Sequence, residues 1–233
     1  MKLYALLSSL DPYDKSNYAL IEVVNKKRSL LSSSLLTSST IELLQKYRAF
    51  ASNTLFQSFE ALNKWNNAQK IVHDWLVEDK YLSLNDMLFL NATLSSHGLM
   101  GWRKTPIYTF NNQHPHEDDL ESLMQEFYNY LNKSLSNWHS LYTAFICRYW
   151  LVSIHPFAEG NGRTSQLIAD YYLLKHGFLP QVFLKKTESL IAASPKKDFM
   201  NPQRAFRKFI QTILNAYDLV LNQHKSSCIT FCF

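Results

Sequence analysis

One stretch of the sequence, residues 137–154, constrains the fold more than any other. It is apolar on most faces of a helix, at Leu141, Ala144, Phe145, Ile146, Tyr149, Trp150, Leu151 and Ile154. A helix of this kind must be covered on all sides, so it belongs in the centre of a helical bundle. The chain of 233 residues also has only 5 glycines and 7 prolines, which argues against a turn-rich β fold. We therefore predict an all-α fold.

Apolar residues recur at helical spacing over much of the remaining sequence. We expect helices at 16–34, 41–62, 68–77, 85–96, 117–132, 163–176 and 203–221. Residues 102–112 break the helical period, which predicts an extended segment or a hairpin.

The charge pattern excludes some functions. The net charge is +5, but lysine and arginine are scattered, with no basic run beyond residues 25–28. We therefore expect no nucleic-acid binding. No apolar stretch approaches the roughly 18 residues that a membrane span needs. The short apolar run at the N-terminus is followed by Asp11 and Asp14, so a helix start is favoured over a signal peptide.

The three cysteines, Cys147, Cys228 and Cys232, form neither a disulfide framework nor a set of metal ligands. A reduced, cytoplasmic compartment fits this count best, with secretion as an effector left open.

Residues 155–163, which read HPFAEGNGR, follow the apolar helix and precede the next one. Pro156 cannot continue a helix, so it forces a turn directly after His155. Gly160 and Gly162 allow positive φ and close backbone approach. The loop then enters a helix, and the free N–H groups of a helix N-terminus form an anion site.

Three side chains of this loop carry chemistry that suits a phosphate. Arg163 offers two parallel donors to phosphate oxygens. Glu159 is a carboxylate of the kind that holds Mg²⁺ beside phosphates. His155, neutral near pH 7, can take a proton from an attacking hydroxyl. Each residue alone is weak evidence, but their order at a helix–loop–helix junction is specific.

The run resembles the motif of the Fic family, His-Pro-Phe-x-Asp/Glu-Gly-Asn-Gly-Arg, at every fixed position, and the likeness extends over about residues 85–215. It implies a Fic-fold helical bundle with a short β-hairpin flap. The implied regions are an N-terminal helical region at 1–84, a Fic core at 85–222 and a tail at 223–233. The implied roles are general base for His155, metal ligand for Glu159, and binding of the donor's phosphates for Gly160, Asn161, Gly162 and Arg163.

The resemblance further implies a protein adenylyltransferase, which moves AMP from ATP onto a Ser, Thr or Tyr hydroxyl of a target protein with Mg²⁺. One position departs from the family. Gln166, which we also assign to donor binding, stands where a second arginine normally contacts the γ-phosphate of the donor. Two alternatives follow: transfer of another nucleoside monophosphate or of phosphocholine, and a Fic-like binding module with weak catalysis.

Residues 38–42, SSTIE, resemble the start of an inhibitory helix that precedes the core in some family members, here near residues 38–50. Glu42 is the candidate inhibitory residue. The pattern breaks at Leu43, and the arginine that normally pairs with this glutamate is Gln166 here. An ordinary helix start explains the same residues equally well.

Overall fold

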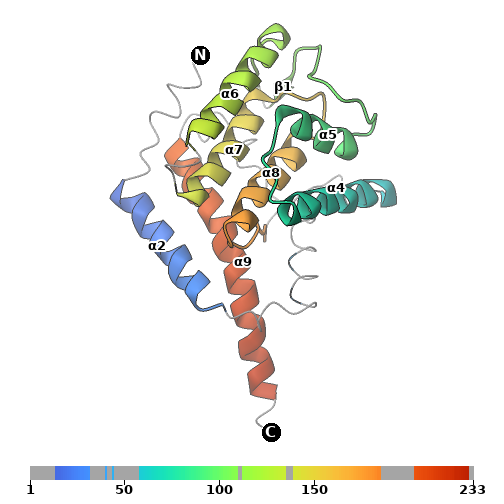
Figure 1. Cartoon of the computed structure of the whole chain (residues 1–233). Coiled ribbons are helices and arrows are strands. Elements are labelled where there is room, and N and C mark those ends of the chain that lie inside the picture. Colours follow the sequence, from blue (N-terminus) through green and yellow to red (C-terminus); the bar gives the residue numbers. More distant parts are fainter. Residues whose placement is uncertain are drawn as a thin grey trace.

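The computed structural model describes residues 14–31, 40, 44, 58–109, 112–134, 139–184 and 202–230. Its elements, in chain order, are α2 (Lys15–Ser29), α4 (Phe59–Val77), α5 (Leu84–Leu94), β1 (Tyr108–Thr109), β2 (Asn112–Gln113), the 3₁₀ turn η2 (Glu117–Asp119), α6 (Leu120–Ser134), α7 (Ser140–Ile154), α8 (Asn161–Lys175) and α9 (Pro202–Thr230). The described chain is mostly helical (Figure 1), which confirms the predicted all-α class.

Helix α7 forms the centre of the bundle, as its sequence predicts. Every residue from Leu141 to Leu151 is buried. The helix contacts α6, α8 and α9. Aromatic rings fill the contacts: Trp150 lies 5.3 Å from Phe127 of α6, centroid to centroid. A helix that is apolar on most faces is therefore covered by its neighbours on most faces.

The prediction of a break between residues 62 and 68 is wrong, because α4 runs unbroken from Phe59 to Val77. Ser58 caps the helix by accepting a hydrogen bond from the backbone N–H of Ala61 at 3.0 Å. Buried side chains then follow a single helical stripe: Trp65, Ala68, Val72 and Trp75. This stripe packs on α5 and α8. Burial of the stripe keeps the helix continuous despite the polar residues between 62 and 68.

Helix α5 begins where the sequence predicts, after Ser83. Ser83 and Asp86 form a reciprocal capping box. The segment after α5 is extended and contains two short antiparallel strands, in which Tyr108 pairs with Gln113 and Thr109 with Asn112. A flap role for this pair stays a prediction. The helix expected from residue 117 begins as the 3₁₀ turn η2 and continues as α6.

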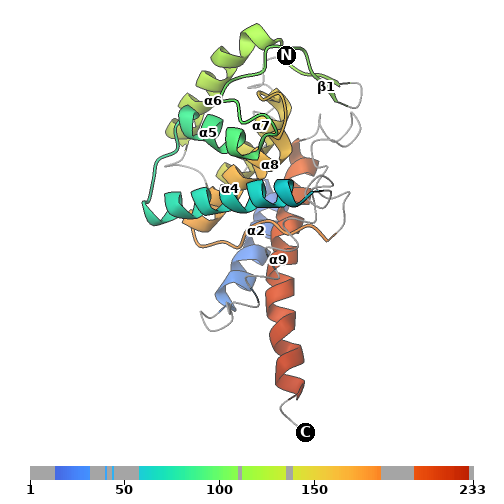
Figure 2. The same ribbon diagram turned by 90° about the vertical axis from the view of Figure 1, so that its right-hand side faces the viewer.

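The last helix, α9, continues to Thr230 instead of ending near residue 221 as expected, and α2 ends earlier than expected, at Ser29. Helix α2 lies along α9, joined by the ion pair between Lys27 and Asp218, and the end of α9 reaches beyond the other helices (Figures 1 and 2). Helix α8 contacts α4, α5 and α7. No helix within the described ranges is long and apolar enough to cross a membrane.

Candidate active site

His155 occupies a strained position at the end of α7. Its backbone is left-handed, with φ of +52°, because Pro156 stops the helix directly after it. The imidazole Nδ1 lies 2.9 Å from the carbonyl oxygen of Val152. A carbonyl only accepts hydrogen bonds, so Nδ1 carries the proton and Nε2 keeps its lone pair. Burial lowers the pKa of His155 to about 4, and the nearby His114 and Arg103 act in the same direction. The side chain is therefore a neutral base at pH 7.

A second histidine, His114, lies against the first, although no sequence motif contains it. The two ring centroids are 4.3 Å apart. His114 follows β2 and is 6% exposed, and its Nδ1 lies 2.9 Å from the carbonyl oxygen of Ser153. Burial lowers its pKa as well. The only sequence signal was its place after the extended segment, and proximity to His155 is a tertiary property.

Asn161 braces the loop. Its Oδ1 accepts from the backbone N–H of Phe157 at 3.0 Å, and its Nδ2 donates to the carbonyl oxygen of Phe157 at 2.8 Å. The residue is 4% exposed. Both ends of the amide are thus used within the chain, which fixes the turn between His155 and α8. Phe157 is 1% exposed and anchors this turn in the core.

Asn91 of α5 holds the loop from the other side, and no pattern in the sequence predicts this role. Its Nδ2 donates to the carbonyl oxygen of Glu159 at 2.9 Å and to Oγ1 of Thr164 at 3.0 Å. Gly160 sits between these groups with φ of +76°, and a Cβ there would lie 3.0 Å from Asn91 Nδ2. Only glycine fits this position without strain.

The carboxylate of Glu159 points toward the end of α5, where Oε1 accepts the backbone N–H of Ser96. Burial alone would raise its pKa, but the hydrogen bonds from Ser96 and the charges of Arg163 and His97 outweigh burial and lower it. The described residues contain no group of three or more acidic, histidine or cysteine side chains that would hold a metal by themselves. A single ionised carboxylate beside an anion site instead fits Mg²⁺ that takes its other oxygens from phosphates and water.

The first turn of α8 is open to an anion. No side chain caps this N-terminus, and the first N–H groups of a helix lack partners within it. Arg163 lies in this turn and is half-buried. Gly162 is exposed, and a Cβ there would meet nothing within 4 Å, so the space over the turn is free in the described structure.

Gln166, one turn further along α8, has an unusual environment. It is 5% exposed, and its buried Nε2 has no hydrogen-bond partner in the part of the chain that the structure describes. A buried donor without a partner lowers the stability of the fold. A hydrogen-bond acceptor on a ligand would therefore bind favourably at this position. Glu42, the candidate inhibitory residue, lies outside the described residues.

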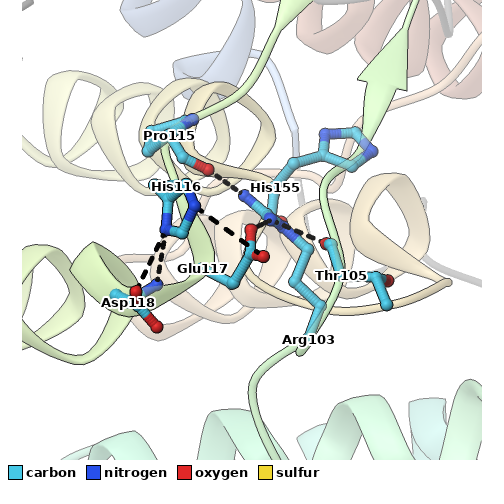
Figure 3. A network of polar contacts seen from close by, with 7 residues as sticks. All are labelled: Arg103, Thr105, Pro115, His116, Glu117, Asp118 and His155. Atoms are coloured by element: carbon cyan, nitrogen blue, oxygen red, sulfur yellow. Dashed lines mark hydrogen bonds and ion pairs between the residues drawn. The ribbon is translucent and has the colours of Figure 1, made fainter.

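Arg103 links the loop to the hairpin segment (Figure 3). The side chain donates to the carbonyl oxygens of His155, Thr105 and Pro115, and Glu117 lies 3.6 Å from it as the counter-charge. Arg103 falls within the extended segment predicted at 102–112, and nothing in the sequence predicts a role for it.

The all-α core presents a neutral histidine beside an uncapped helix N-terminus, an arginine and an ionised carboxylate. These groups suit a phosphate-bearing ligand. Residues 75–173 match the model of the Fic/DOC family. This part of the chain is therefore similar to a Fic/DOC domain.

Curated proteins that match this chain are named protein adenylyltransferase Fic. The chain is 35% identical over 127 residues to a protein adenylyltransferase Fic of Drosophila mojavensis, a match that covers 52% of this chain and 25% of that protein. A protein of the same name from Drosophila grimshawi is also 35% identical, with 26% of its length covered. The chain thus spans about a quarter of the length of these curated relatives.

Solved structures of Fic proteins share the fold. Fic-1 (residues 134–508) of C. elegans superposes with a TM-score of 0.68 at 16% identity, covering 93% of this chain and 80% of that one. IbpAFic2 covalently tethered to Cdc42 gives a TM-score of 0.64 at 18% identity, covering 85% and 69% of the two chains. IbpAFic2-H3717A in complex with adenylylated Cdc42 gives 0.58 at 18% identity, covering 91% and 82%. These likenesses establish the Fic fold of this chain.

Proposed function

We propose that this chain is a protein adenylyltransferase, which moves AMP from ATP onto the hydroxyl of a Ser, Thr or Tyr side chain in a target protein. The observation that carries the proposal is the neutral His155, held in one tautomer and set beside the open N-terminus of α8. The matching relatives named protein adenylyltransferase Fic support the choice of reaction.

In this proposal Nε2 of His155 takes the proton of the target hydroxyl as its oxygen attacks the α-phosphorus of ATP. The bond to the α-phosphorus forms, the bond to the β,γ-pyrophosphate breaks, and pyrophosphate leaves. Catalysis of such a step rests mostly on positioning and on stabilisation of charge. The pKa of about 4 keeps His155 unprotonated at pH 7 but makes it a weak base, which suits a hydroxyl that loses its proton late in the step.

The donor's phosphates would lie over the first turn of α8, against its N–H groups and the guanidinium of Arg163. Glu159 would hold Mg²⁺ together with those phosphates, and the ion would offset the charge of the leaving pyrophosphate. Asn161 supports this cradle indirectly, because its side chain fixes the turn.

The target would lie along the hairpin segment. Tyr108 of β1 is 65% exposed, and a short strand with an open edge can pair with an extended peptide. Such pairing would bring a target hydroxyl toward His155, since His114, in the segment that follows β2, lies against the imidazole of His155.

The test is labelling with ATP that carries the isotope on the α-phosphate, in parallel with ATP labelled on the γ-phosphate. The chain is incubated with Mg²⁺ and a cell lysate, and His155→Ala serves as the inactive control. Transfer of AMP labels protein only from the α-label and only with the wild-type chain. Label from the γ-phosphate alone, or equal labelling by His155→Ala, would refute the proposal.

A second candidate is transfer of a different phosphate-linked group, and Gln166 favours it. A neutral amide replaces the charge that would grip a γ-phosphate, and its Nε2 lacks a partner in the described structure. This change would reduce the binding affinity less for donors without a γ-phosphate, such as a CDP-linked phosphocholine, than for ATP. The labelling experiment includes such a donor, along with the other nucleoside triphosphates.

A further inference from the structure

The guanidinium of Arg103 lies buried in the segment between α5 and β1. Its side chain is 0% exposed. Nε donates to the carbonyl oxygen of His155 at 2.8 Å, Nη1 to that of Thr105 at 2.9 Å, and Nη2 to that of Pro115. Figure 3 shows these acceptors around the guanidinium. Carbonyl oxygens in three directions match the flat fork of arginine, and no other side chain supplies so many donors.

These three carbonyls belong to parts of the chain that must be aligned for transfer. Thr105 precedes β1 and Pro115 follows β2, so the guanidinium ties both ends of the hairpin segment together. His155 ends α7. A fourth contact, from the backbone N–H of Arg103 to the carbonyl oxygen of Pro156 at 2.9 Å, joins the same segment to the loop.

The hydrogen bond to Pro115 also restrains the position of His114, the residue before it. The ring of His114 lies against that of His155, tilted by 31° with centroids 4.3 Å apart, and its Nδ1 lies 2.9 Å from the carbonyl oxygen of Ser153. Arg103 therefore acts on the imidazole of His155 in two ways. It hydrogen-bonds the backbone of His155 directly, and it hydrogen-bonds Pro115, which is next to the His114 ring that lies against the imidazole.

We propose that Arg103 is a positioning residue, which fixes the hairpin segment and the base His155 in one mutual arrangement. The part of this inference that concerns transfer rests on the proposed function. Arg103 touches neither donor nor target in this proposal and acts through His155 and the hairpin. The donor cradle has its own supports, Asn91 and Asn161. Loss of the guanidinium should therefore impair transfer while leaving donor binding intact.

The alternative is that Arg103 only stabilises the fold, and the chain offers a matched control for it. Arg148 of α7 is 5% exposed, against 3% for Arg103. It hydrogen-bonds Gln181 and lies over the ring of Phe183, 4.9 Å from its centroid. Replacing either arginine by lysine keeps a buried charge and removes the fork, so general destabilisation affects both variants.

The experiment compares Arg103→Lys with Arg148→Lys in the full chain. Thermal unfolding and nucleotide affinity are measured first, then the hydrogen exchange of the amides of residues 103 and 155, then labelling kinetics. In Arg103→Lys we expect nucleotide affinity within about threefold of wild type, amide exchange faster by roughly tenfold, and kcat lower by about 10²-fold, the usual effect of a misplaced base. Arg148→Lys should show none of these selective changes.

Equal changes in both variants, or wild-type exchange at residue 155 in Arg103→Lys, would overturn the positioning role. Glu117→Gln serves if Arg103→Lys does not fold, because it keeps the fork and removes only the counter-charge at 3.6 Å. It should shift exchange and kcat in the same direction by a few-fold, and unchanged values would again count against the role. If the wild-type chain transfers no group, the proposed function fails, while the exchange of residues 103 and 155 still decides whether Arg103 holds the base.

Discussion

Two buried amides on α8 should respond to replacement in opposite ways. Asn161 is 4% exposed and Gln166 is 5% exposed. Asn161 makes two hydrogen bonds to the backbone of Phe157, at 3.0 and 2.8 Å. The Nε2 of Gln166 makes none among the described residues. The perturbation is a pair of near-isosteric apolar substitutions, Asn161→Leu and Gln166→Met.

The size of each change in stability follows from the hydrogen-bond partners that the substitution leaves unpaired. Asn161→Leu leaves the N–H and the carbonyl of Phe157 unpaired, at about 1–3 kcal/mol for each buried group, hence a loss of about 2–4 kcal/mol once some water enters. For a chain of this length, 1 kcal/mol corresponds to about 2–4 °C in Tm, so Tm should fall by roughly 4–16 °C. Gln166→Met removes a donor that had no partner, so Tm should be unchanged or slightly higher.

The assay is thermal unfolding without and with saturating Mg²⁺-nucleotide. Ligand binding raises Tm by mass action. If the amide of Gln166 binds the donor, Gln166→Met should have the Tm of wild type without nucleotide. Its Tm should then rise less than that of wild type when Mg²⁺-nucleotide is added. Equal losses of Tm in the two variants without nucleotide would refute the reasoning, because it would show that the Gln166 amide is paired in the folded chain.

The remaining predictions concern the proposed chemistry. His155→Ala should lower the rate of transfer by about 10²–10⁴-fold with nucleotide affinity retained, measured by labelling and calorimetry, and near-wild-type activity would contradict a base role. The pKa of His155 is lowered to about 4, so the neutral base exists above that pH and is lost only as the pH falls through it. Between pH 8 and 5.5, kcat/KM for transfer should stay nearly constant. A catalytic histidine of ordinary pKa would be only about one-tenth neutral at pH 5.5, and kcat/KM would then fall about tenfold. Glu159→Ala should abolish the Mg²⁺-dependence of nucleotide binding with little change in Tm, and equal Mg²⁺-nucleotide affinity in mutant and wild type would show that Glu159 is no ligand. Gln166→Arg should tighten ATP binding by up to roughly tenfold, since a charged hydrogen bond is worth more than a neutral one. If Glu42 is inhibitory, Gln166→Arg should also restrain transfer until Glu42→Gly is added, and no effect of Glu42→Gly in either background would mark an ordinary helix start.

Sequence alone determined the features that depend on local order along the chain. Residues 141–154 are apolar on most faces of a helix and therefore require a central position, because a helix at the surface of a bundle covers only one face. Likewise, Pro156 and Gly160 set the break and the re-entry into a helix through backbone sterics alone. The motif from His155 to Arg163 could therefore be placed at a helix–loop–helix junction, and the family match over residues 75–173 includes it.

Tertiary structure decided everything that depends on residues distant in sequence. Asn91 lies 68 residues from Glu159 and yet bonds its carbonyl, and Arg103 lies 52 residues from His155 and yet holds its backbone. No periodicity marks such residues, because a buried polar side chain is recognised only by the partners that folding brings to it. The same reason explains why Asn161 was assigned to the donor's phosphates while its amide is bonded to Phe157, and why the lowered pKa of His155, which arises from burial, first became visible in the folded chain.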